Sequence, residues 1–160
     1  MTQLKRLGPI VVLSAVITLI AGAALATPPE DAVVTLLARG SVGELDARHG
    51  DVEVKRANGN ADVATFKVAI EPGGSAGWHH HPGVVLVSVA SGSVTEYHEN
   101  CDKTVLKAGE GFSEGTNETH LVRNTGNDDA ELYATFIVPS STSEEELRID
   151  DPQPEDCDAE

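Results

Sequence analysis

From residue 51 onward, the chain is a series of short apolar and β-branched segments separated by residues that favour turns. Apolar side chains alternate with others over residues 61–70, and residues 84–89 and 132–138 form further β-branched or apolar runs. The interruptions are Asn58-Gly59, Pro72-Gly73-Gly74, Ser91-Gly92, Gly109-Glu110-Gly111 and Thr125-Gly126-Asn127. Many short strands at this spacing indicate an all-β sandwich or barrel, and no long amphipathic helix is predicted in the body.

The first 26 residues have the pattern of a secretory signal. Lys5 and Arg6 precede an apolar run that ends in Ala24-Leu25-Ala26, a small-residue pattern that suits cleavage before Thr27. The alternative is an uncleaved membrane anchor, because about 20 apolar residues can span a bilayer. Either interpretation predicts that residues 27–160 lie outside the cytoplasm, as a secreted or periplasmic protein, and cleavage would leave no stable membrane contact.

The predicted exported portion is strongly acidic. All 26 Asp and Glu follow residue 26, against nine of the 11 Lys and Arg, which gives a formal net charge of −17 with His neutral. Such a surface repels nucleic acid and anionic lipid, and solubility alone explains it. The charge therefore argues against nucleic acid as a partner.

The two cysteines, Cys101 and Cys157, are predicted to form a disulfide. An even cysteine count is typical of an exported chain with paired thiols. Closing so long a loop contributes about 3–4 kcal/mol in the chain-entropy model. The alternative is two free thiols, whereas metal ligation is disfavoured because neither belongs to a close pair such as C-x-x-C.

Four regions are expected along the chain. They are a signal segment (1–26), an N-terminal lead (27–50), a β-barrel domain (51–139) and an acidic C-terminal tail (140–160). Residues 32–39 fit a short helix or a strand, since short apolar runs are ambiguous. In the tail, Ser143 is predicted to cap a short helix, and the rest is expected to be extended except where Cys157 anchors it.

Three histidines carry the clearest chemical signal. His79 and His81 are two residues apart, so on a strand both point to one face while His80 points to the other. His120 belongs to a later predicted strand. Imidazole is the commonest transition-metal ligand, so three converging imidazoles form a plausible metal site.

At these positions the sequence resembles the cupin family. The first cupin motif, G-x5-H-x-H-x3-E-x6-G, is matched in register by Gly73, His79, His81 and Gly92. The second motif, G-x5-P-x-G-x2-H-x3-N, is matched by Gly109, His120 and Asn124, with Gly115 and Asn117 at its proline and glycine positions. The resemblance spans about residues 60–138.

The resemblance implies a double-stranded β-helix, a jelly-roll barrel in which His79, His81 and His120 bind a divalent metal. Val85 occupies the motif's glutamate position and cannot bind metal. Three neutral imidazoles suit Fe, Ni, Cu or Zn better than Mn or Mg. Asn124 is expected to stabilise a turn through hydrogen bonds to the backbone.

Two further residues lie near these motifs. Glu114 is the best substitute for the missing glutamate, but an exposed turn carboxylate is the favoured interpretation. His80 is predicted to be a non-ligand by strand parity, unless a bulge before Pro82 changes that parity.

Three functions fit the sequence. The first is a metal-dependent enzyme acting on a small molecule, a dioxygenase or an isomerase, for which no catalytic base is evident. The second is a non-catalytic module that binds a small ligand or a metal, and the third is a barrel that has lost its metal. A homodimer is a family-based expectation, and one fold hosts many chemistries.

Overall fold

The computed structural model describes residues 26–55, 58–157 and 159 of the 160-residue chain. The predicted signal segment therefore lies outside the described residues, apart from Ala26. Within the described part, no helix is both long enough and apolar enough to cross a membrane.

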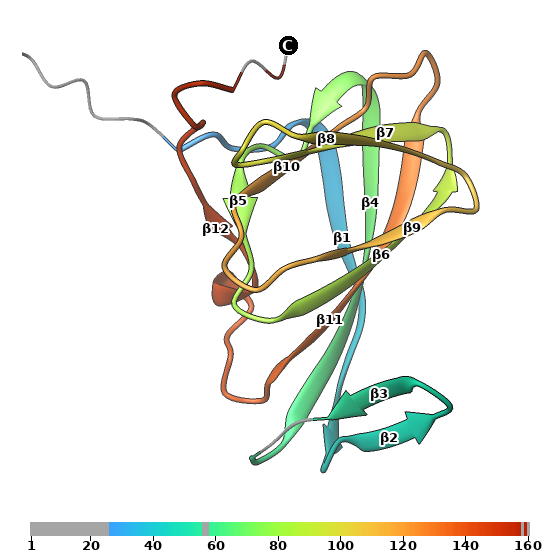
Figure 1. The fold of residues 1–160 in the computed structure, drawn as a ribbon, viewed down its shortest axis with the longest axis vertical. Helices are drawn as coiled ribbons and strands as arrows, with labels where there is room; N and C mark the ends of the chain where they lie inside the picture. Colours follow the sequence, from blue (N-terminus) through green and yellow to red (C-terminus); the bar gives the residue numbers. More distant parts are fainter. Residues whose placement is uncertain (1–25, 56–57, 158, 160) are drawn as a thin grey trace, which may run out of the picture.

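The described residues form an all-β barrel, which confirms the predicted fold class (Figure 1). The strands are β1 (Glu30–Gly43), β2 (Asp46–His49), β3 (Val52–Lys55), β4 (Ala61–Ser75), β5 (His79–His80), β6 (Val84–Ser91), β7 (Ser93–His98), β8 (Lys103–Lys107), β9 (Gly111–Glu114), β10 (His120–Arg123), β11 (Ala130–Pro139) and β12 (Ile149–Asp150). One turn of 3-10 helix covers Glu145–Leu147.

One ten-stranded antiparallel sheet curls into the barrel. Its main order is β12-β5-β10-β4-β11-β6-β9, with β1 paired to β4 and the β7–β8 hairpin paired to β10. Figure 1 shows β1, β4 and β11 side by side along the long axis, while β7, β8 and β10 cross one end. The β2–β3 hairpin forms a separate two-stranded sheet.

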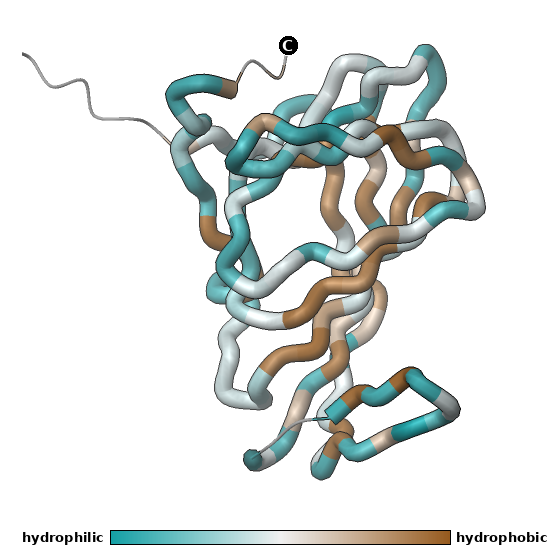
Figure 2. Tube along the Cα trace, viewed as in Figure 1, coloured by the Kyte–Doolittle hydropathy of each residue, from teal (hydrophilic) through white to brown (hydrophobic). Residues whose placement is uncertain are grey.

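The core follows from the alternation of side chains along the strands. In β11 every second residue from Ala130 to Val138 is buried, and β6 buries Val85, Val87 and Val89 on the same principle. Figure 2 shows the corresponding hydrophobic stretches along β6 and β11, with hydrophilic residues in the connecting turns. The rings of Phe66 and Phe136 meet edge to face at 5.1 Å in this core.

The lead segment settles one ambiguous prediction. Residues 32–39 are strand, because β1 pairs with β4 along nearly its whole length. β1 is an edge strand with several exposed apolar side chains, among them Val33 and Leu37. Pairing with a neighbour therefore decides the conformation, not the pattern of the run itself.

Asn124 has the predicted turn role. Its side chain is fully buried, and its amide nitrogen donates to the carbonyls of Ile70 and Asp128, both at 2.9 Å. Its amide oxygen accepts from the backbone N–H of Gly126 at 2.9 Å. This asparagine thus fixes the turn between β10 and β11 to the end of β4.

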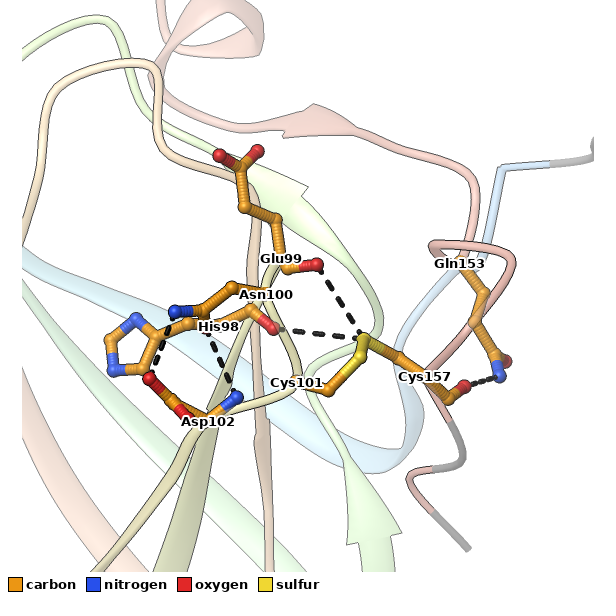
Figure 3. Close-up of a disulfide and its surroundings, with 7 residues drawn as sticks. All are labelled: His98, Glu99, Asn100, Cys101, Asp102, Gln153 and Cys157. Carbon is orange, nitrogen blue, oxygen red and sulfur yellow. Dashed lines mark hydrogen bonds between the residues drawn. A yellow bond between two sulfur atoms is a disulfide. The ribbon is translucent and has the colours of Figure 1, made fainter.

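The predicted disulfide is present. Cys101 lies in the β7–β8 turn and Cys157 in the tail, with their Cα atoms 5.2 Å apart (Figure 3). Around it, the Cys157 sulfur lies 3.6 Å from the carbonyl oxygen of Glu99, and Gln153 donates to the Cys157 carbonyl. The bond ties the end of the tail to the barrel.

The tail packs on the barrel more extensively than its acidic composition predicts. Leu147 is buried in the main core, and β12 pairs with β5. Ser143 does not cap the 3-10 turn with its hydroxyl; instead its backbone N–H donates to the Glu146 carboxylate at 2.8 Å. We call residues 140–157 the strap, because they cross the barrel beside the histidine-bearing strands.

Candidate metal centre

The barrel brings the three predicted histidines together. His79 on β5 is the direct cross-strand partner of His120 on β10, and His81 follows β5 in a bridge to Thr116. All three side chains are buried, with residue exposures of 4%, 3% and 2% for His79, His81 and His120. Two segments some 40 residues apart in sequence therefore converge on one point.

The cluster has the dimensions of a metal site. One ligand nitrogen from each ring lies within 4.8 Å of the other two. A single ion about 2.1 Å from each imidazole nitrogen bridges up to about 4.2 Å between two of them. Only small side-chain shifts therefore separate these rings from a shared ion.

The other ring nitrogens determine which atoms face the shared point. Each Nδ1 donates to a backbone carbonyl, which can only accept. The acceptors are Gly77 for His79 (2.8 Å), Leu147 for His81 (2.6 Å) and Glu118 for His120 (2.8 Å). When such a ring is neutral, its Nε2 carries no proton, and the lone pair of Nε2 can bind a metal.

Glu114 supplies a carboxylate beside this cluster, so its interpretation as an exposed turn residue was wrong. It ends β9 and is only 7% exposed. Its carboxylate oxygens lie 3.2 Å from Nε2 of His81 and 3.3 Å from Nε2 of His120. The alternation of side chains along a strand could have predicted this burial, because Glu114 shares a face with the apolar Phe112 two residues earlier.

Glu114 lies next to the position of the family's missing glutamate. Val85, at the motif's glutamate position, is the direct cross-strand partner of Glu114. In this chain a carboxylate therefore stands on β9, opposite the motif's glutamate position on β6. It reaches the same cluster from the neighbouring strand.

Burial and neighbouring charges shift the pKa values of His79, His120 and Glu114. Burial lowers the pKa of His79 well below its ordinary value, and the nearby charge of His120 lowers it further. Burial opposes charge on His120 too, but the adjacent Glu114 carboxylate outweighs it and raises the pKa of His120. Burial would raise the pKa of Glu114, yet contacts with His120 and His81 hold that pKa far below its usual range.

His80 lies outside the cluster, in agreement with strand parity. Its Nδ1 is 2.7 Å from a carboxylate oxygen of Asp151 in the strap, and Thr119 donates to that same oxygen at 2.9 Å. His80 thus helps to hold the strap on the barrel.

An apolar cavity of about 280 Å³ opens beside the cluster. His79, His81 and Glu114 line one part of it, and most of the remaining wall is apolar, including Phe66 and Phe136. The strap contributes Leu147, Glu144 and Arg148. Sequence analysis missed Arg148 as a cavity residue, because only the return of the strap across the barrel brings it there.

Comparison with known proteins agrees with this architecture. The cupin domain family matches residues 66–136. An oxalate-binding protein of Thermotoga maritima is 30% identical over 100 residues, which cover 62% of this chain and 81% of that protein. The chain is a cupin.

Several solved structures resemble this cupin at lower similarity. A predicted oxalate decarboxylase from Thermotoga maritima is 25% identical, with a TM-score of 0.43, covering 50% of this chain and 82% of that one. An oxalate oxidase is 24% identical, also with a TM-score of 0.43, covering 49% of this chain and 46% of that one. A protein with a double-stranded β-helix domain from Klebsiella pneumoniae is 19% identical, with a TM-score of 0.47, covering 72% of this chain and 81% of that one.

Proposed function

We propose that this cupin binds one divalent transition metal through Nε2 of His79, His81 and His120 and holds a small-molecule ligand in the adjoining cavity. The observation that carries the proposal is the set of three Nδ1–carbonyl hydrogen bonds, which leave Nε2 of each ring as the nitrogen that can bind a metal. Such a metal supplies Lewis acidity to a bound ligand, and, if it is iron, chemistry with dioxygen.

The donor set determines which divalent metals suit the site. Imidazoles suit Fe, Ni, Cu and Zn, as the sequence predicts. Glu114 adds a carboxylate within reach of two of the three rings, and carboxylates also suit Mn. The buried carboxylate lowers the net charge of an occupied site from +2 to +1, and this extends the predicted metals to include Mn.

Metal titration of the apoprotein tests this proposal. Addition of Zn²⁺ or Ni²⁺ is expected to raise the melting temperature, and ligand at a hundred times its Kd stabilises the fold by about 2.7 kcal/mol. Mg²⁺, which prefers oxygen ligands, serves as the control and is expected to have little effect. Absence of any stabilisation by Fe²⁺, Mn²⁺, Ni²⁺, Cu²⁺ and Zn²⁺ would reject the proposal.

The same titration has an expected pH dependence. The pKa of His120 lies above its ordinary value of 6.5, and the metal must displace the proton that the ring holds below that pKa. The apparent affinity for the metal is therefore expected to fall as the pH decreases below the pKa of His120, by up to about tenfold per pH unit. Isothermal titration at several pH values measures the slope, and an affinity that rises toward acid pH would contradict it.

We also propose that the protein is exported and cleaved after Ala26. The Cys101–Cys157 bond supports this, because disulfides persist in oxidising compartments. The intact mass of the protein from its native cell decides the matter: a chain starting at Thr27 is expected, and a full-length cytoplasmic chain would exclude export.

Two activities fit the metal proposal, a dioxygenase reaction and an isomerisation. A non-catalytic metal or ligand carrier is the alternative. Oxygen uptake and product analysis with candidate small acids distinguish catalysis from binding.

A further inference from the structure

The strap places a cation at the wall of the cavity. Arg148 lies between the buried Leu147 and strand β12, whose pairing with β5 sets Asp150 opposite His79. Its side chain is 26% exposed and lines the same cavity as His79. Arg148 is therefore held beside the histidine cluster by the packing of Leu147 on one side and by the pairing of β12 with β5 on the other.

The Arg148 guanidinium is incompletely satisfied within the described part of the chain. Nη2 forms an ion pair with an oxygen of Asp150 at 2.8 Å, and the other guanidinium nitrogens make no hydrogen bond to the described residues. Asp150 itself is exposed at the rim. A guanidinium carries five N–H donors in a planar fork that matches a carboxylate, so this group retains capacity for an anionic ligand.

The rest of the cavity lining favours a ligand whose remaining part, away from the anionic group, is apolar. Its walls are mainly apolar side chains of β4 and β11, including Ile70 and Leu132. Of the two acidic residues in the lining, Glu114 is engaged by histidines and Glu144 is exposed to solvent. The cavity thus combines a cation, Arg148, and a cluster that would become cationic on binding a divalent metal, with an apolar interior.

We propose that this cupin binds small organic monoacids with an apolar body, and that Arg148 on the strap recognises their carboxylate. The inference rests on the proposed function in that it assigns the ligand of the same site. The proposed ligand differs from oxalate, because oxalate has two carboxylates and no apolar portion. Among the described residues that line the apolar interior, none offers a cation for a second carboxylate, and burial of an unpaired charge is costly.

Isothermal titration of Zn²⁺-loaded protein with a homologous series of acids tests the inference. Affinity is expected to increase about fourfold for each methylene from propanoate to hexanoate. The matched neutral amides are expected to bind at least about tenfold more weakly, because they lack the charge that pairs with Arg148. Oxalate binding as tightly as hexanoate would overturn the inference.

Substitution of Arg148 isolates its role. Arg148→Gln is expected to weaken acid binding at least about tenfold while amide binding is unchanged, and Arg148→Lys is expected to retain part of the acid preference. Arg123→Gln, on β10 and outside this cavity lining, is the matched control. Unchanged acid binding by folded Arg148→Gln protein would overturn the assignment.

Elemental analysis of the same samples separates this inference from the metal proposal. Full metal content with loss of acid binding in Arg148→Gln supports both proposals. Acid binding that depends on Arg148 in a protein that takes up no metal would reject the metal site and leave the inference standing.

Discussion

Alanine in place of His79 or His120 is expected to abolish stoichiometric metal binding. Each substitution removes one of three buried imidazoles, and loss of His120 also removes a partner of the Glu114 carboxylate. Replacing even the outer partners of metal ligands costs about 10–100-fold in affinity, so loss of a direct ligand is expected to cost at least a hundredfold. Elemental analysis after dialysis against low metal measures the effect.

A matched histidine controls for side-chain loss. His49 is exposed at the end of β2, far from the cluster in the fold, and His49→Ala is expected to retain wild-type metal content (Figure 1). Circular dichroism establishes that each variant is folded. Equal metal content in the wild type and both cluster variants would contradict the site assignment.

A second large effect is expected from moving the carboxylate between strands. Glu114→Val removes the only carboxylate in contact with these rings among the described residues, and metal affinity is expected to fall about 10–100-fold. Val85→Glu in the same chain restores a carboxylate at the cross-strand position. The double variant is therefore expected to recover most of the lost affinity, measured by competition with a chelator.

The single Val85→Glu variant provides the control. Val85 is fully buried, so a second carboxylate next to Glu114 is expected to destabilise the fold through desolvation and like-charge repulsion. The relocation account fails if Glu114→Val keeps wild-type affinity. It also fails if the folded double variant binds metal no better than Glu114→Val alone.

The histidine cluster could be predicted because its determinants are local. Alternation along a strand places His79 and His81 on one face, and motif spacing identifies His120. The disulfide between Cys101 and Cys157 could be predicted for a similar reason, since two cysteines allow one intramolecular pairing. These predictions needed no knowledge of how the strands pair.

Other features depend on strand pairing and could not be predicted. The register sets Glu114 opposite Val85 and beside the histidines, whereas its position next to a turn suggests an exposed side chain. Likewise, the acidic composition of the strap indicates an open tail, but Leu147 packs in the core and its carbonyl orients His81. Long-range contacts thus override local propensity at the parts of the site that come from β9 and the strap.

The most direct test of the account is a crystal structure of the metal-loaded protein with anomalous diffraction at the metal absorption edge. The account predicts one strong peak within about 2.0–2.2 Å of Nε2 of His79, His81 and His120, with a Glu114 oxygen as the neighbouring carboxylate. A fully loaded protein with its metal elsewhere, or with any of these rings turned away from the ion, would contradict it.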